Sequence, residues 1–285
     1  MSLDIDKLYN SKWEDAMPKI ASNSVDLIVT SPPYNVSLGD NKHKKDKYDG
    51  YEDNMPYDEY LKWIKKLFVE CHRVLKVGGR FSVNIGEGRN GQIPTHVDFT
   101  TMLLNLSLDE DPFQMMTTII WNKNQVGART AWGSFQSPSQ PSFPTPFEFV
   151  IVVSKGTLKH EGDKNKISVS KEDFIRNSNA LWTILPETQM MKLYNHPAMF
   201  PEELPRRLID QLTYEEDVVL DPFSGAGTVC AVAKQMNRHY IGIEMSEYYH
   251  GQAQKRLSLI PTIKKVVIDG KEVSIPDWLV PEKKE

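Results

Sequence analysis

Residues 217–244 constrain the fold more strongly than any other stretch of this sequence. The segment DVVLDPF at 217–223 is an apolar run that ends in an aspartate and a proline, which is typical of a buried strand. Gly225 and Gly227 follow, and then come the helical pattern TVCAVAKQM and the strand pattern HYIGIEM. Strands that alternate with helices in this way predict a doubly wound, mostly parallel α/β sheet.

The same alternation of elements extends along the rest of the chain. Apolar periodicity predicts a helix over 57–75 that ends at Gly78 and Gly79. Polar composition predicts that 155–180 is mainly loop, and Asp269-Gly270 is a hairpin turn signal. Further strands are expected at 25–29, 80–86, 117–123 and 147–155, helices at 201–212 and, capped by Ser246, at 246–257, and the hairpin at 265–275.

Length and composition favour a soluble α/β protein. The 285 residues suit one large domain, and we treat 1–285 as a single unit. No apolar run approaches the roughly 18 residues of a membrane span, and the first residues lack the apolar core of a signal peptide. Two cysteines make neither a disulfide framework nor a metal cluster, so a cytoplasmic protein without a metal is expected. A net charge of −4 argues against nonspecific coating of nucleic acid.

The turn after residue 221 has the features of a nucleoside-cofactor site. Gly225 and Gly227 let the backbone approach a ligand, and the helix that follows offers free amides. Glu244 lies about 20 residues downstream, where a carboxylate can reach a ribose diol. Cys230 stands where the third glycine of a dinucleotide fingerprint would fall, and no Walker motif is present. Asp221 could hold a cationic amine, so S-adenosylmethionine fits better than NAD or ATP.

A second unusual segment, TSPPYN at 30–35, follows the apolar run VDLIV. Two prolines remove backbone donors and fix φ, so they end a strand stiffly with carbonyl groups free to point outward. Such a segment suits a binding site, and an ordinary strand-ending turn is the alternative.

Together these motifs resemble the beta group of DNA amino-methyltransferases. The cofactor motif of that family, Asp-Pro-Phe-x-Gly-x-Gly-Thr, is matched by DPFSGAGT, and its catalytic motif by SPPY. A third family motif is matched by HPAMFP at 196–201, and the catalytic motif precedes the cofactor motif, as in the beta group. The resemblance runs from about residue 7 to residue 257. The Gly-Asp-Cys found near the N-terminus of many members is replaced around Asn10-Ser11, so no adenine contacts are assigned there.

The resemblance implies a methyltransferase fold with a small target-recognition insertion, and it implies roles for residues of the three motifs. Cofactor-binding residues are expected to be Asp221, Phe223, Gly225, Gly227, Thr228, Glu244, His196 and Phe200. Catalytic residues are expected to be Ser31, Pro32, Pro33 and Tyr34. Ser31 Oγ and the Pro32 carbonyl would accept the amine hydrogens of a flipped base, on which Tyr34 would stack.

The target atom is expected to be an amine of cytosine. Methylation at carbon 5 needs a cysteine nucleophile, whereas Cys71 and Cys230 lie within predicted helices and are interpreted as buried thiols. Within the family, Ser-Pro-Pro-Tyr resembles the cytosine-N4 enzymes and Asp-Pro-Pro-Tyr the adenine-N6 enzymes. Adenine remains the alternative.

Double-stranded DNA is the expected partner. The loop 40–55 is expected to face DNA, and 155–180 lies where the family has target recognition. Phosphate contacts are assigned to Lys42, Lys44, Lys45 and Lys47. The aromatic residues Trp132, Phe135, Phe143 and Phe147 are interpreted as loop anchors or as a wall of the base pocket. A restriction-modification system with a cognate endonuclease is the expected context, and a homodimer is possible for such an enzyme.

Three other classes compete with this interpretation. An RNA amine methyltransferase usually has the cofactor motif first, which is not the order here. An inactive nucleic-acid-binding relative would not need both motifs intact. An NAD oxidoreductase would need the third glycine.

Overall fold

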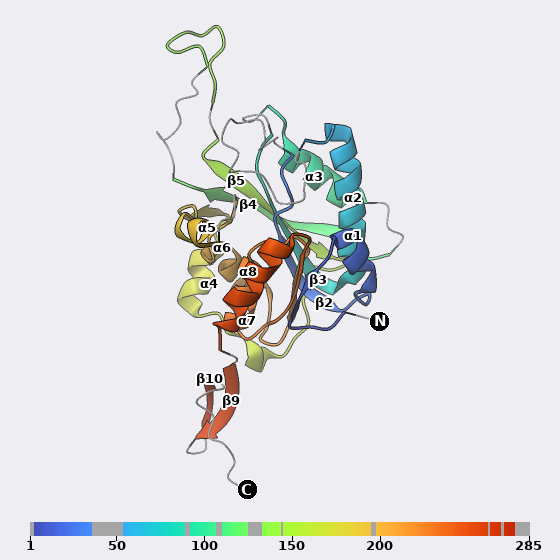
Figure 1. Cartoon of the computed structure of the whole chain (residues 1–285), viewed down its shortest axis with the longest axis vertical. Helices are drawn as coiled ribbons and strands as arrows, with labels where there is room; N and C mark the ends of the chain where they lie inside the picture. The colour runs from blue at the N-terminus through green and yellow to red at the C-terminus, as the bar shows by residue number, and fades with distance from the viewer. Residues whose placement is uncertain are drawn as a thin grey trace.

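The computed structural model describes residues 3–35, 54–88, 92–106, 110–124, 133–143, 145–194 and 198–261, and the backbone of 263–268 and 271–276. These residues form an eight-stranded sheet with helices on both faces and a separate C-terminal hairpin (Figure 1). Within the described part of the chain, no helix has the length and apolar character needed to cross a membrane.

The sheet is mostly parallel, with the order β1-β8-β7-β2-β3-β5-β4-β6. Only the pairings of β5 with its neighbours β3 and β4 are antiparallel within it. The strands are β1 (Lys7–Asn10), β2 (Val25–Thr30), β3 (Leu75–Ile85), β4 (Phe113–Asn122), β5 (Phe147–Lys155), β6 (Leu181–Thr183), β7 (Val218–Asp221) and β8 (His239–Glu244). The predicted doubly wound α/β fold is therefore confirmed.

Two apolar clusters cover the two faces of the sheet. The first contains Tyr60, Phe68 and Phe99 from the helices on one face, and the second contains Leu208 and Val232 from the helices on the other. The helices are α1 (Trp13–Ala16), α2 (Tyr57–Val74), α3 (Thr95–Leu104), α4 (Lys171–Asn177), α5 (Gln189–Tyr194), α6 (Glu203–Leu212), α7 (Thr228–Gln235) and α8 (Glu247–Ser258). In Figure 1, α1, α2 and α3 lie on the right of the sheet, whereas α4, α5 and α6 lie on the left.

The order of the strands reverses between β2 and β7. After β2 the chain continues outward through β3 on one side, and after β7 it continues through β8 on the other. These two strands pair in parallel, with Leu27 opposite Val219 and Ile28 opposite Leu220. Ligands of open α/β sheets bind at the carboxyl ends of strands at such a reversal. The fold therefore places the ends of β2 and β7 where a site is expected.

The predicted end of the first long helix is wrong in one respect. Helix α2 ends at Val74, and β3 begins directly at Leu75, before the two glycines. Val25 pairs with Leu75 and Leu27 pairs with Arg80, so residues 76–79 form a bulge inside the strand. Gly78, with φ +79°, lies against the carbonyl of Lys159, which leaves no space for a side chain.

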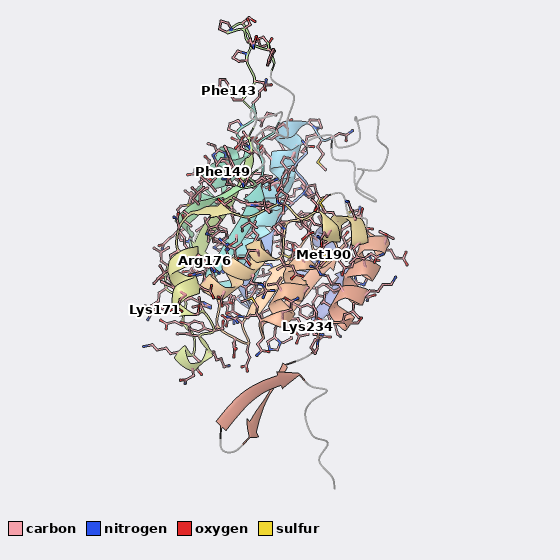
Figure 2. All side chains as sticks on the ribbon, turned by 90° about the vertical axis from the view of Figure 1, so that its left-hand side faces the viewer. Phe143, Phe149, Lys171, Arg176, Met190 and Lys234 are labelled. Atoms are coloured by element: carbon pink, nitrogen blue, oxygen red, sulfur yellow. The ribbon has the colours of Figure 1, made fainter. Side chains whose placement is uncertain are left out.

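Most of the stretch 155–180 lies outside helices and strands, as its polar composition predicts. It contains a 3₁₀ turn (Lys164–Lys166) and helix α4, whose N-cap Ser170 accepts a hydrogen bond from the amide of Asp173 at 3.0 Å. It packs along the amino-terminal edge of the strands, where the amide of Glu215 donates to the carbonyl of Lys166 at 2.9 Å. In Figure 2, Lys171 and Arg176 of this stretch lie well below Phe143. The target-recognition role expected for 155–180 stays a prediction.

The C-terminal hairpin agrees with its sequence pattern. Strands β9 (Ile263–Ile268) and β10 (Lys271–Pro276) pair antiparallel, with Ile268 opposite Lys271. The turn residues Asp269 and Gly270 lie outside the described residues.

We predict opposite stability changes for two glycine-to-alanine substitutions. Gly78→Ala should destabilise the fold by about 2 kcal/mol or more, because a left-handed φ disfavours a side chain and a Cβ would lie 2.2 Å from the Lys159 oxygen. Gly251→Ala, inside α8 with nothing within 4 Å of its Cβ position, should stabilise the fold by about 1 kcal/mol. Urea denaturation measures both values. Equal effects of the two substitutions would contradict the bulge geometry.

Candidate functional site

A cavity of about 660 Å³ opens at the carboxyl ends of β2 and β7. The two predicted motifs meet in it, although they are separated by some 190 residues in the chain. The predicted residues that line it are Ser31, Pro33, Tyr34, Phe200, Asp221, Phe223, Gly225, Thr228 and Glu244. The structure therefore brings the two motifs into one site, as two parallel strands that end side by side must do.

Asp221 links the two halves of the cavity. Its side chain is buried at the end of β7, and Oδ1 accepts hydrogen bonds from Thr30 Oγ1 at 2.7 Å and from the amide of Phe223 at 3.0 Å. Burial raises the pKa of the Asp221 carboxyl to about 7, because the charged form loses its hydration. A buried carboxyl that titrates near neutrality is suited to binding a cationic group.

The glycine turn after Asp221 is held by Glu244, at the end of β8. One carboxylate oxygen of Glu244 accepts from the amide of Gly225 at 2.8 Å, and the other accepts from the amide of Ser246 at 2.8 Å. Gly225 has φ +50°, which favours glycine. A carboxylate offers about four acceptor positions, so Glu244 can both fix this turn and accept from a ligand hydroxyl.

Two residues around this turn have mainly structural contacts. Gly227 does not line the cavity; it precedes α7 with φ +77°, and a Cβ there would lie 2.9 Å from the Cβ of Ala253. Thr228 lines the cavity, and its hydroxyl accepts from the buried Arg256 at 3.0 Å. Arg256 also pairs with Glu202 at 2.6 Å, so α6, α8 and the glycine turn are joined.

The other half of the cavity is built from residues 31–34. Ser31 Oγ lies 3.1 Å from Tyr34 Oη and 3.3 Å from the carbonyl oxygen of Asn84. Pro32 is buried, and the carbonyl of Pro33 accepts from Tyr60 Oη at 2.7 Å. These contacts fix the backbone of the motif before any ligand binds.

The ring of Tyr34 lies against the glycine that follows β3. A Cβ on Gly86 would lie 3.1 Å from Cε2 of Tyr34, so a larger residue there would push the ring by a few tenths of an ångström. Because Tyr34 also lines the cavity, its ring can offer a flat apolar surface to a ligand.

The cavity-lining residues that the sequence interpretation missed include Asn84, Trp121, Lys123 and Glu148. Glu148 accepts from Tyr34 Oη at 2.9 Å and from Asn84 Nδ2 at 2.7 Å, and it pairs with Lys123. A sequence signal existed, because Asn84 and Glu148 are each flanked by apolar residues within their strands.

Several predicted residues cannot be located in the cavity. His196, Trp132 and the four lysines Lys42, Lys44, Lys45 and Lys47 lie outside the described residues. Phe135 and Phe143 are 70% and 80% exposed, so they neither anchor their loop on the core nor line the cavity. Phe147 lies on β5 against Phe149, with ring centroids 5.4 Å apart.

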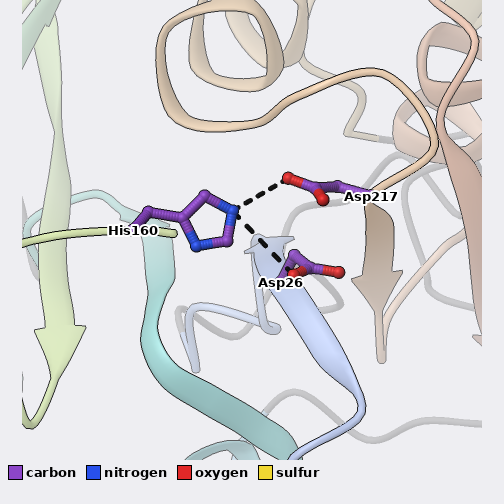
Figure 3. Close-up of side chains that lie close together, drawn as sticks. All are labelled: Asp26, His160 and Asp217. Atoms are coloured by element: carbon purple, nitrogen blue, oxygen red, sulfur yellow. Dashed lines mark hydrogen bonds and ion pairs between the residues drawn. The ribbon is translucent and has the colours of Figure 1, made fainter. Parts of the chain in front are cut away.

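A separate cluster of Asp26, His160 and Asp217 lies at the amino-terminal edge of the strands (Figure 3). His160 Nε2 lies 2.8 Å from Asp217 Oδ2 and 3.9 Å from Asp26 Oδ1. Lys76 Nζ lies 2.8 Å from both oxygens of Asp26 and already neutralises that carboxylate, which makes the cluster unsuited to a divalent cation. We assign it the role of attaching the segment around His160 to β2 and β7.

Comparison with known proteins places this geometry in a family. Residues 25–255 match the model of a DNA methylase family. The type II methyltransferase M.MjaVI of Methanocaldococcus jannaschii is 38% identical over 172 residues, 60% of this chain and 81% of that protein. The type II methyltransferase M.BglII, from Bacillus subtilis, is 31% identical over 268 residues, 89% of this chain and 69% of that protein.

Solved structures share the fold. TTHA0409 of Thermus thermophilus, whose name assigns it to the DNA modification methylases, superposes in its complex with S-adenosyl-L-methionine with a TM-score of 0.68. It is 26% identical, and the match covers 90% of this chain and 94% of that one. The cytosine-N4-specific PvuII DNA methyltransferase superposes with a TM-score of 0.64 at 21% identity. The match covers 90% of this chain and 87% of that one.

We predict that binding of S-adenosylmethionine depends on the titration of Asp221. With a pKa of about 7, the carboxyl is largely protonated below neutrality and cannot pair with a cationic ligand. The apparent dissociation constant should therefore rise about tenfold between pH 8 and pH 6. Calorimetry at several pH values measures this slope, and Asp221→Asn should abolish it. A constant affinity across this range would contradict the role of Asp221.

Proposed function

The chain belongs to the DNA methylase family whose model it matches, and we propose that it methylates the exocyclic N4 amine of cytosine in double-stranded DNA. The observation that carries this proposal is the shared cavity, in which Ser31 and Tyr34 lie beside Asp221 and Glu244. An amine acceptor site and a nucleoside site in one cavity are what transfer between these two ligands requires.

S-adenosylmethionine is the methyl donor, and the residues of the cavity fit it. The buried carboxyl of Asp221 can hold a cation, and Glu244 can accept hydrogen bonds from ribose hydroxyls. Gly225, which has no side chain, lets the ligand approach the backbone. The buried hydroxyl of Ser224, which has no partner among the described atoms, adds a polar group that a ligand can satisfy. When bound, this cofactor supplies an electrophilic methyl group on a sulfonium. Phe200 lines the same cavity and can pack on its apolar part.

Ser31 and Pro32 prepare the amine for reaction. The lone pair of an exocyclic base amine is delocalised into the ring, so the amine is a weak nucleophile. Acceptance of its two hydrogens by Ser31 Oγ and the Pro32 carbonyl would favour a tetrahedral nitrogen whose lone pair points out of the ring plane. The rigid proline pair holds these acceptors in place, which limits the entropy lost at the transition state. The proton displaced from nitrogen passes to water.

The choice of cytosine rests on the motif Ser-Pro-Pro-Tyr, and DNA as substrate rests on the family. The amine is inaccessible inside a duplex, so the base must flip out, and Tyr34 can stack on it. The two type II methyltransferases above support a place as the modification enzyme of a restriction-modification system. Recognition of a specific site and DNA contacts of Lys42, Lys44, Lys45 and Lys47 belong to this proposal.

The modified base tests the proposal directly. The chain is expressed in a host without DNA methylation, and the genomic DNA is digested to nucleosides and analysed by mass spectrometry. We expect N4-methylcytosine among the nucleosides. Detection of N6-methyladenine would instead identify adenine as the target base. The absence of any methylated amine would contradict the proposed function.

Two substitutions should separate methyl transfer from cofactor binding. Ser31→Ala should slow single-turnover transfer by roughly 100-fold, because one preorganised acceptor is lost, with cofactor affinity nearly unchanged. Asp221→Ala should weaken cofactor binding first. Loss of both properties to the same degree in Ser31→Ala would refute the role assigned to Ser31.

A further inference from the structure

Glu148 is a carboxylate of the cavity wall that belongs to none of the recognised motifs. Its side chain is 13% exposed, and it reaches the cavity from the start of β5. One oxygen accepts from Tyr34 Oη and Asn84 Nδ2, and the other pairs with Lys123, whose side chain is 20% exposed. Lys123 balances the charge that Glu148 would otherwise place in a partly buried site.

These contacts fix the direction of the hydrogen bond of Tyr34. An ionised carboxylate can only accept, so the single hydroxyl hydrogen of Tyr34 points to Glu148. Towards Asn84 Nδ2, at 2.7 Å, and Ser31 Oγ, at 3.1 Å, Tyr34 Oη must then accept. Because Tyr34 donates to Glu148, Tyr34 Oη is an acceptor towards Ser31.

The direction of the hydrogen bond of the Ser31 hydroxyl follows from the same reasoning. Its one hydroxyl hydrogen can go to Tyr34 Oη or to the carbonyl oxygen of Asn84 at 3.3 Å, and both are protein acceptors. Towards a ligand in the cavity Ser31 Oγ is then left with its lone pairs, so it can only accept. An amine that must donate its hydrogens needs this state, whereas an unconstrained serine hydroxyl could donate or accept.

We propose that Glu148 is a positioning residue for methyl transfer, which acts through Tyr34 to keep the Ser31 hydroxyl an acceptor for the target amine. The proposal rests on the proposed function. It also gives the hydroxyl of Tyr34 a role that is separate from stacking of its ring on the base.

The test compares Glu148→Gln, Tyr34→Phe and the double variant with wild type. Glutamine can donate as well as accept, and phenylalanine keeps the ring without the hydroxyl. Each single variant should slow single-turnover transfer by roughly 10- to 100-fold, with the dissociation constants of cofactor and duplex changed less than about twofold. The double variant should be no slower than the slower single variant, because both changes break one chain of contacts.

A matched control separates this result from general effects of removing a carboxylate. Glu59→Gln, on the exposed side of α2, should leave the transfer rate unchanged. Full activity of Glu148→Gln, independent losses in the double variant, or a loss of cofactor affinity equal to the loss of rate would overturn the proposal. A wild-type chain that methylates no amine would refute the proposed function instead, so the two failures are distinguishable.

Discussion

Parallel pairing between β2 and β7 is the contact on which the whole site depends. Their carboxyl ends lie at one edge of the sheet, so the segments that follow, 31–34 and 222–226, reach the same cavity. The hydrogen bond of 2.7 Å from Thr30 to Asp221 joins the two strand ends directly. A change in the register of this pair would separate the amine site from the cofactor site, because successive residues of a strand face opposite sides.

The two halves of the cavity differ in the groups that face a ligand. The cofactor half uses burial, which brings the pKa of Asp221 to about 7 and makes the carboxyl respond to a cationic ligand. The proposed target half uses the neutral groups of Ser31 and Tyr34, and Glu148, with Lys123 as its counter-ion, accepts a hydrogen bond from Tyr34 Oη. Under the proposed function, the charge of Glu148 lies behind Tyr34, and the uncharged Ser31 serves as the acceptor for the target amine.

The sequence allowed prediction of the sheet and of both motifs, because buried parallel strands and glycine turns leave local signals. The bulge at Gly78 escaped prediction, since it depends on pairing with β2 and contact with Lys159. Glu148 and Asn84 were missed because their role arises only when β5, β3 and residue 34 meet in space. The role of the stretch 155–180 was predicted from the order of the motifs in the family. Its contacts with Asp26 and Asp217 join residues far apart in the chain, so they could not be predicted from local sequence.

A crystal structure with a nonreactive analogue of S-adenosylmethionine and a target duplex would show whether both ligands share the cavity at the ends of β2 and β7. We expect the ammonium group of the analogue to contact Asp221 and an extruded cytosine to place its amine within hydrogen-bond reach of Ser31 Oγ. The amine nitrogen should lie about 3 to 3.5 Å from the position of the transferable methyl group. An analogue bound away from Asp221, or a base bound outside the cavity between β2 and β7, would contradict the account.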